Sequence, residues 1–396
     1  MDDNRIDFPG KDELSPKKRL RQQHFKRLKA RIYTILFVVV VAAIIIVAYF
    51  TYERNKVYTS LSMLETVAFD PAPGAVVDDF AGGILTYSKD GAQVTDPSGN
   101  LLWNRTFDMQ NPMQSICGET VAFADYGGSM IYVQTKGGES FDIKTDMPIR
   151  KITVSDRGIV AAVLEDVDVT WIYLYDSNGE TIAYFRTTME KSGYPVDLDI
   201  SPSGELVGVS YYYLDISDVK SSVAFYNFGD VGQNNIDNYV SGYNYKDSLV
   251  PVVRFISDST VFALSGERLT IYGGAQKPVS VKETFIDQEV LSVFYGNDNI
   301  GVVFRNNTED EYKLIVYSSK GDVVSEKAFN FDYSDVVFSN GYYAIYGNTD
   351  LYVATLEGKT KLDIKYDKPI RLLIPTASPT KYVLVTDVSI DTVQMK

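Results

Sequence analysis

A short turn built around a glycine recurs seven times in this 396-residue chain, and it is the feature that most limits the fold. Each copy separates two runs of β-branched and aromatic residues, and glycine supplies the positive φ that a hairpin turn needs. The copies are spaced by 37 to 50 residues, and the one at Gly274 is degenerate. Their glycines are Gly99, Gly138, Gly179, Gly229, Gly274, Gly321 and Gly358. The pattern predicts a series of similar antiparallel units.

Prolines mark where many of these units begin. Proline is tolerated at the first residue of a strand, because its missing N–H is not needed there by the ladder. Five units open in this way, at Pro112, Pro148, Pro195, Pro251 and Pro369. With the turns, they predict seven full units that start near residues 74, 112, 148, 195, 250, 289 and 334. An eighth unit starts at Pro369 and is one strand short.

A period in the low forties with about four strands per unit is typical of a β-propeller. The segment Leu64–Asp70 is similar to the outer strands that end other units, such as Glu283–Asp287. Pairing this segment with the last unit would complete it and close the ring without an open sheet edge. We therefore predict an all-β, eight-bladed β-propeller. Seven blades is the alternative, and an array of β-sandwiches is a third.

Residues 32–52 form a run of 21 uncharged residues. As a helix, the run is roughly 31 Å long and can cross a hydrocarbon core of about 30 Å. Eight basic residues and no acidic one lie between Ser15 and Arg31. The positive-inside rule then predicts a cytoplasmic tail (1–31), a signal-anchor helix in the lipid bilayer (32–52), a linker (53–60) and an extracytoplasmic propeller (61–396). A cleaved signal peptide is the alternative, but its apolar core would be only about 7–15 residues long.

The two sides of this helix carry opposite charge. Residues 1–31 hold ten Lys or Arg and five Asp or Glu, a net charge of +5, so the remainder carries −19 of the total of −14. The basic tail is attracted to anionic lipids of the inner leaflet. The acidic remainder repels nucleic acid, so we expect no nucleic-acid partner.

Scarce histidine and cysteine restrict the chemistry. The one histidine, His24, lies in the tail, and the one cysteine, Cys117, lies in an apolar strand-like run. Histidine-based triads and imidazole zinc sites are therefore excluded from residues 53–396. The acidic clusters Glu165–Asp168 and Asp197–Asp199 do not match a calcium-binding loop, and we interpret them as solvated loop charges. We expect no enzyme activity and no cofactor.

The hairpin turns carry a resemblance. In Ala92–Trp103 a strand is followed by Asp96, a turn with Gly99, and a strand that bears Trp103. A second copy surrounds Gly179 and has Tyr184 in place of the tryptophan. These motifs resemble the repeats of quinoprotein-type propellers and of the bacterial outer-membrane assembly lipoprotein propeller, which implies the fold and a role as a docking platform. Two tryptophans in all and no adjacent cysteine pair do not fit quinone-dependent catalysis. An anchor joined to such a propeller also resembles an uncharacterised family of Gram-positive membrane proteins.

Unit four has the longest insertions, and both are rich in tyrosine. One follows its second strand and the other precedes unit five, so in a propeller both connections open on one face. We predict an exposed partner-binding patch, because such side chains are favoured at interfaces. Its residues are Tyr211, Tyr212, Tyr213, Asp215, Tyr239, Tyr243 and Tyr245. The alternative is that these tyrosines belong to an elongated strand pair and pack on a neighbouring blade.

These observations predict a non-catalytic scaffold or adaptor, anchored in the membrane, that presents a propeller to a protein or cell-envelope component outside the cytoplasm. The alternative is a sensor-like module that uses the same aromatic patch to bind a carbohydrate or cell-wall fragment.

Overall fold

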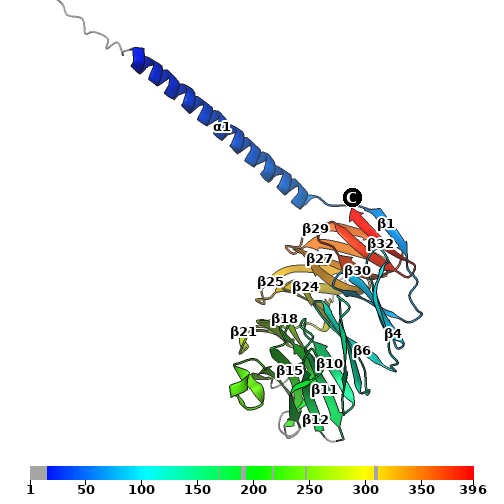
Figure 1. Cartoon of the computed structure of the whole chain (residues 1–396). Coiled ribbons are helices and arrows are strands. Elements are labelled where there is room, and N and C mark those ends of the chain that lie inside the picture. The colour runs from blue at the N-terminus through cyan, green and yellow to red at the C-terminus, as the bar shows by residue number, and fades with distance from the viewer. Residues whose placement is uncertain (1–15, 168, 189–192, 216–217, 246–247, 307–310) are drawn as a thin grey trace, which may run out of the picture. The chain divides into compact units, whose positions relative to one another are not determined.

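The computed structural model describes residues 16–167, 169–188, 193–215, 218–245, 248–306 and 311–396. The chain forms two compact units, Met1–Lys56 and Val57–Lys396. The first contains helix α1 (Pro16–Asn55), which includes the apolar run and the basic residues ahead of it (Figure 1). Between Arg31 and Ala48 the helix is long and apolar enough to cross a membrane, and its large apolar side chains are exposed. Residues 1–15 of the expected tail lie outside the described residues.

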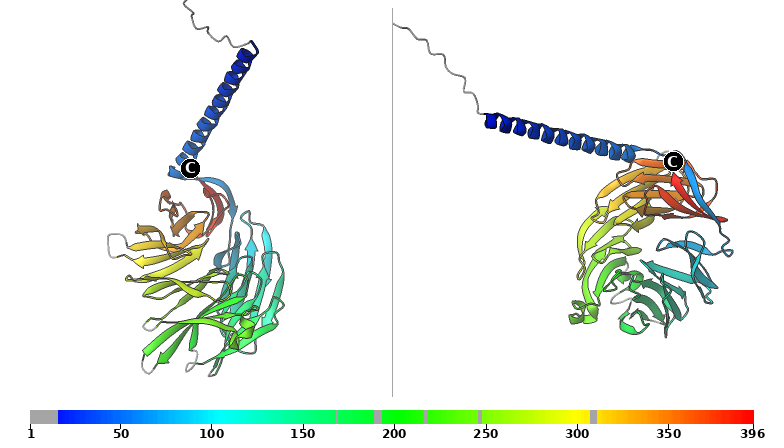
Figure 2. Two further views of the ribbon diagram at one scale, coloured as in Figure 1. Left: turned by 90° about the vertical axis from the view of Figure 1, so that its left-hand side faces the viewer. Right: turned by 45° about the horizontal axis from the view of Figure 1, so that its top comes forward.

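The second unit is a ring of eight four-stranded antiparallel sheets, the blades of a β-propeller (Figure 2). The strands of blades 1 to 4, from the inner to the outer strand, are β2 (Val76–Phe80), β3 (Gly83–Ser88), β4 (Gly91–Thr95) and β5 (Leu101–Thr106); β6 (Pro112–Cys117), β7 (Thr120–Asp125), β8 (Met130–Thr135) and β9 (Ser140–Lys144); β10 (Ile149–Val154), β11 (Val160–Asp166), β12 (Val169–Tyr175) and β13 (Thr181–Thr187); β14 (Tyr194–Ile200), β15 (Leu206–Asp215), β16 (Asp218–Asn227) and β17 (Tyr239–Tyr245).

The other four blades repeat this order. Their strands are β18 (Val252–Ser257), β19 (Thr260–Leu264), β20 (Arg268–Gly273) and β21 (Val279–Phe285); β22 (Val290–Gly296), β23 (Asn299–Arg305), β24 (Tyr312–Ser318) and β25 (Val323–Phe329); β26 (Tyr333–Ser339), β27 (Tyr342–Gly347), β28 (Asp350–Thr355) and β29 (Thr360–Lys365); β30 (Ile370–Pro375), β31 (Lys381–Thr386), β32 (Ser389–Met395) and β1 (Leu61–Ala68). The inner strands begin within about two residues of the predicted unit starts, so the eight-bladed prediction is confirmed.

Blade 8 takes its outer strand from the other end of the propeller sequence. Strand β1 pairs with β32 in antiparallel register, from Leu61 opposite Met395 to Ala68 opposite Ser389. The inner strands β30 and β2 also lie in contact, which joins blade 8 to blade 1. The predicted closure is therefore confirmed, with the strand starting three residues earlier than the segment proposed from the sequence.

The second strand of each blade shows why the core is so apolar. Each blade is sandwiched between two neighbours, so both faces of this strand are covered and every residue can be apolar. In β11 the run Val160–Leu164 is buried at all five positions. The outer strands are much more exposed, because they lie at the rim of the ring; β1 and β21 contain no buried residue.

Six of the seven predicted turn glycines adopt positive φ, between 79° and 126°, in the connection between the third and fourth strands. Gly229 does not, so the prediction of a tight turn there was wrong. Eleven residues, 228–238, connect β16 to β17 and include two short 3-10 helices, η1 (Gly232–Asn234) and η2 (Ile236–Asn238). The glycine that this connection requires is Gly232, where a Cβ would overlap the carbonyl oxygen of Asn227.

Candidate functional site

The residues of the predicted tyrosine patch lie in the strands of blade 4. Tyr211–Asp215 form the end of β15, which pairs with β16 along ten residues from Leu206 opposite Asn227 to Asp215 opposite Asp218. Tyr239–Tyr245 are the outer strand β17. The prediction that these segments are connections was therefore wrong: Tyr211–Asp215 lengthen the hairpin of β15 and β16, and Tyr239–Tyr245 are a strand of the sheet. The side chain of Asp215 lies outside the described part of the structure.

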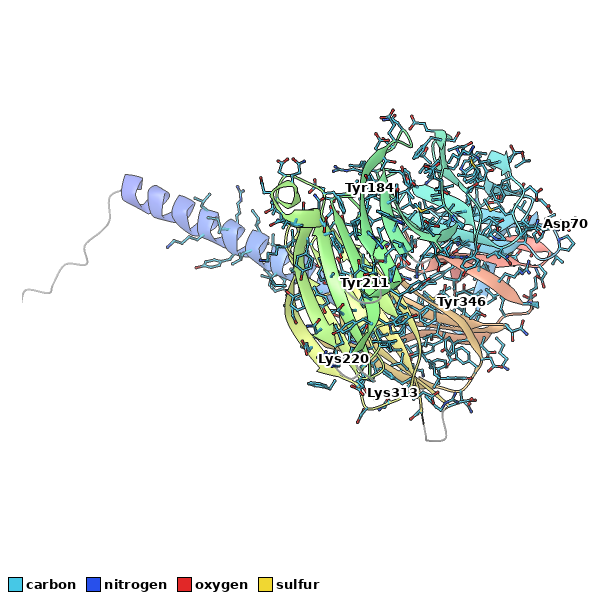
Figure 3. All side chains as sticks on the ribbon, turned by 90° about the horizontal axis from the view of Figure 1, so that it is seen from below. Asp70, Tyr184, Tyr211, Lys220, Lys313 and Tyr346 are labelled. Carbon is cyan, nitrogen blue, oxygen red and sulfur yellow. The ribbon has the colours of Figure 1, made fainter. Side chains whose placement is uncertain are left out.

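Two of the predicted patch residues are core residues. Tyr211 and Tyr245 are each 1% exposed, so the expectation that they are exposed was wrong. Tyr211 packs toward blade 3 and shares a hydrogen bond of 2.9 Å with the hydroxyl of Tyr226 (Tyr211 is labelled in Figure 3). Tyr245 packs toward blade 5, and its hydroxyl lies 2.7 Å from that of Tyr272. Strand alternation turns these side chains toward the neighbouring blades.

The other tyrosines lie closer to the surface. Tyr212 and Tyr213 are half-buried, and the Tyr212 ring lies 5.6 Å from that of Tyr194. Tyr243 is also half-buried, and its hydroxyl donates to the carbonyl oxygen of Pro278 at 3.1 Å. Tyr239 is 46% exposed. Of the predicted tyrosines, Tyr239 thus offers the most surface to a partner.

Tyr239 forms one wall of a groove of about 330 Å³ on the face of blade 4 that points toward blade 3. The residues that line it are Tyr211, Ser222, Val223, Ala224, Tyr226, Tyr239, Gly242, Tyr243 and Asn244. We call this site the blade-4 groove. Its aromatic walls and uncharged lining suit stacking and hydrogen bonding.

Small residues make the floor of the blade-4 groove. Ser222 pairs with Asn244 and Ala224 with Gly242 across the ladder of β16 and β17. A Cβ at Gly242 would overlap the hydroxyl of Tyr239, so glycine is required for the tyrosine to lie over the strand. The Tyr239 ring lies 6.0 Å from that of Tyr226, edge to face.

The two buried hydroxyls of the groove, those of Tyr211 and Tyr226, remain neutral near pH 7. The pKa of Tyr226 is raised to about 12, chiefly by burial; the hydrogen bond with Tyr211 opposes the rise, and the nearby Tyr239 and Asp237 contribute to it. Burial also raises the pKa of Tyr211 well above its ordinary value. The described residues that line the groove include no carboxylate or amine.

Sequence reasoning missed a second concave site, a cavity of about 300 Å³ lined by residues of blades 1, 6, 7 and 8. Asp78 and Asp79 of β2 and Asp335 of β26 line it. Burial raises the pKa of all three carboxyls, to about 6 for Asp335, where the charge of Asp78 adds to the effect. Adjacent acids in an apolar strand were the available signal. Among the described residues, no group of three metal-ligating side chains has an arrangement that could hold a metal ion.

The cluster Asp197–Asp199 lies in the inner strand β14, where Asp197 is buried and Asp199 is half-buried, so its interpretation as solvated loop charge was wrong. Asp197 forms ion pairs with Lys151 of β10 and with Arg254 of β18, the latter at 2.5 Å. Asp199 accepts hydrogen bonds of 2.8 Å from the Thr153 hydroxyl and the Phe255 backbone N–H. These contacts join the inner strands of blades 3, 4 and 5.

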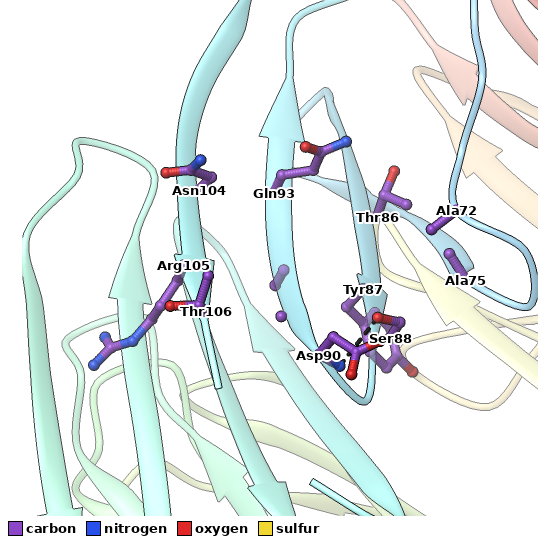
Figure 4. A pocket seen from close by; sticks show the side chains of 12 residues that line it. Ala72, Ala75, Thr86, Tyr87, Ser88, Asp90, Gln93, Asn104, Arg105 and Thr106 are labelled. Atoms are coloured by element: carbon purple, nitrogen blue, oxygen red, sulfur yellow. Dashed lines mark hydrogen bonds between the residues drawn. The ribbon is translucent and has the colours of Figure 1, made fainter. Parts of the chain in front are cut away.

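A third concavity, of about 240 Å³, lies on blade 1 (Figure 4). Its lining is mixed: polar side chains such as Asp90, Gln93 and Asn104 stand beside apolar alanines. Arg105 at its margin forms an ion pair with Asp142 of blade 2 and lies 4.9 Å over the ring of Tyr132. The arginine is thus committed to holding two blades together.

Cys117 is half-buried, and burial raises its pKa to about 12, so its thiol remains protonated.

These features define the class: an eight-bladed β-propeller preceded by an apolar helix. The chain belongs to DUF5711, a family of unknown function, whose model matches residues 54–395. A search of curated proteins returns no match to this sequence.

Solved structures share the propeller fold. BamB from Moraxella catarrhalis superposes with a TM-score of 0.50 at 10% identity, over 85% of this chain and 100% of that chain. Sqt1 from Saccharomyces cerevisiae gives a TM-score of 0.56 at 12% identity, over 87% and 100%. The computationally designed Ika8 protein gives 0.52 at 11% identity, over 86% and 100%. The expected resemblance to quinoprotein-like propellers is thus confirmed at the level of the fold.

Proposed function

We propose that this protein is a non-catalytic scaffold that is anchored in the membrane by residues 32–52 and holds a protein or cell-envelope partner at its propeller outside the cytoplasm. The blade-4 groove carries the binding role, because it combines an exposed tyrosine with neutral hydroxyls and a floor of small residues. Tyrosine contributes large contact area and a polar tip, the combination favoured at binding surfaces. The propeller folds of BamB and Sqt1 support a scaffold role.

The basic residues ahead of the apolar run support the proposed orientation, with residues 1–31 in the cytoplasm. Protease added to intact spheroplasts tests it. The propeller should be digested while a tag at the N-terminus stays protected, and substituting Lys17, Lys18 and Arg19 with Glu should weaken this asymmetry. Digestion of the tag with survival of the propeller would reverse the orientation.

Crosslinking in cells followed by affinity recovery tests the binding role. The variant Tyr239→Ser should lose the partner without a change in melting temperature. The matched control is Tyr184→Ser, which removes a tyrosine that is 59% exposed on the outer strand of blade 3. This control should retain the partner. Equal recovery by both variants would remove the groove from the proposal.

The second candidate is a sensor-like module for a carbohydrate or cell-wall fragment. The exposed Tyr239 ring and the amide of Asn244 line the same groove, which favours this candidate, since aromatic faces and amides suit a polar ligand with apolar faces. Binding of purified cell-wall fragments to the intact protein, lost in Tyr239→Ser, would favour this candidate. Recovery of a single protein partner would favour the scaffold.

A further inference from the structure

The outer strand of blade 4 differs from every other outer strand that the structure describes. An outer strand pairs on one side only, and charged residues are the usual protection of such an edge against another chain. Strand β17, with the sequence YVSGYNY, contains no Asp, Glu, Lys or Arg. Each of the other seven contains at least one, namely Glu65 in β1, Arg105 in β5, Asp142 in β9, Arg186 in β13, Lys282 in β21, Glu326 in β25 and Asp363 in β29.

We propose that β17 receives an extended segment of a partner protein as a fifth strand of blade 4. This inference rests on the proposed scaffold function and specifies how the partner binds. In an antiparallel sheet, alternate residues of an edge strand direct both N–H and C=O to the unpaired side. An added strand forms hydrogen bonds with these groups, and pockets beside the edge select its side chains.

The blade-4 groove lies where those side chains arrive. A strand added beside β17 lies about 4.8 Å from it, and every second side chain points to the same face as Gly242 and Asn244. That face carries the groove of about 330 Å³ with its floor of small residues. The exposed Tyr239 lies at the first residue of the strand, where it can cover the end of the incoming segment.

Charge decides between a different protein and a second copy of this chain. The connection that leads into β17 contains Asp230 and Asp237, both exposed, and no Lys or Arg. The chain from residue 32 onward carries −19, so two copies would repel each other along this edge. The occupant is therefore a neutral, strand-forming segment with Lys or Arg at the end that lies beside Asp237.

The test begins with the full-length protein in its own membranes. Replacing Tyr239 by p-azidophenylalanine keeps an aromatic side chain of similar size and places a photocrosslinker at the groove. Crosslinked peptides should map to one short segment of one protein, with a basic residue at one end. The probe is then a synthetic peptide with that sequence, in two forms that carry N-methyl groups on alternate sets of backbone amides.

If the segment binds by strand addition, the two methylated peptides should bind with different affinities. Methyl groups on the amides that face β17 should weaken binding by roughly tenfold or more, whereas methyl groups on the opposite set should change it little. Asn244→Lys, which adds a charge to the edge, should weaken the unmodified peptide to a similar extent. The matched control Val281→Lys adds the same charge to the exposed edge strand β21 of blade 5 and should bind as the wild type does.

The outcomes separate strand addition from the proposed function. Equal binding of both methylated peptides, with Tyr239→Ser still losing the partner, overturns strand addition and leaves the scaffold. Crosslinks to a second copy of the chain overturn the heterologous partner. If crosslinking in cells recovers no partner with the wild-type protein, the proposed function and strand addition are both overturned.

Discussion

Blade 8 and blade 4 treat their outer strands in opposite ways. In blade 8 the outer strand comes from the other end of the propeller sequence, and the blade contains an ion pair between the buried Asp391 and the partly exposed Lys368. Asp391 of β32 is fully buried and accepts hydrogen bonds from Lys368 at 2.8 Å, Tyr366 at 2.7 Å and Ser389 at 3.0 Å. In blade 4 the outer strand follows directly along the chain and carries no charge at all. The comparison separates an edge built to hold the ring together from an edge left suitable for another chain.

The largest effect is expected from removing residues 61–68. Without β1, blade 8 loses its outer strand and β32 becomes a new open edge, which promotes aggregation. The propeller should lose its single cooperative transition in differential scanning calorimetry. If the shortened protein melted as the intact one does, the pairing of β1 with β32 would not hold the ring closed. The difference between the outer strands of blades 8 and 4 would then have no structural consequence.

Within blade 4, Tyr245→Ser should destabilise the protein strongly. Truncating a buried aromatic residue costs about 3–5 kcal/mol, and the hydroxyl of Tyr272 would also lose its partner. Chemical denaturation measures this change. A cost below about 1 kcal/mol would mean that the tyrosine contributes little to the core.

Asp391→Asn should cost about 2–3 kcal/mol, somewhat less than a fully buried pair, because the partly exposed Lys368 can regain water. The control in the same blade is Asp387→Asn, which breaks the exposed pair between Arg371 and Asp387 and should cost less than about 0.5 kcal/mol. Similar costs for the two variants would show that the pair between Lys368 and Asp391 stabilises blade 8 no more than an exposed pair does.

The cost of Asp391→Asn should also depend on pH. Burial opposes ionisation, but the hydrogen bonds from Lys368, Tyr366 and Ser389 outweigh it and hold the pKa of Asp391 below its usual range. A carboxyl with a lowered folded pKa stabilises the protein above its unfolded value of about 3.9, and this contribution is lost as the pH falls through the folded value. The difference between wild type and variant should therefore be full at pH 7 and decrease below about pH 4. A difference that stays constant down to pH 2 would contradict the shift.

The smallest effect on stability is expected at the blade-4 edge itself. Tyr239→Ser and Asn244→Lys alter exposed positions, so each should change the free energy of unfolding by less than about 0.5 kcal/mol. Equilibrium denaturation compares them with Tyr245→Ser. A loss of several kcal/mol in either variant would make this edge part of the core and weaken its assignment as a binding surface.

The sequence predicted the repeat well because its signals are local. A glycine with positive φ or a proline at a strand start is dictated by a few neighbouring atoms, and six of the seven glycines and the five unit starts marked by proline follow from such rules. The predictions that failed concern burial, which depends on contacts between distant parts of the chain. Whether Tyr211 or Asp197 is buried depends on strand register and on the facing blade, and a shift of one residue exchanges the two faces. That Tyr239 is exposed and that β17 is an edge strand without charge can be recognised only after the outer strands have been identified.

The closure of blade 8 also sets an order of events during synthesis. Strand β1 is among the first parts of the propeller to leave the ribosome, yet its partner β32 is the last strand to be made. At roughly 5–20 residues per second, Leu61 must wait tens of seconds for Met395. Every blade before the last can form from neighbouring segments, but the ring itself cannot be completed until β32 has been translated. A chain interrupted anywhere before β32 therefore retains a β1 strand without its partner.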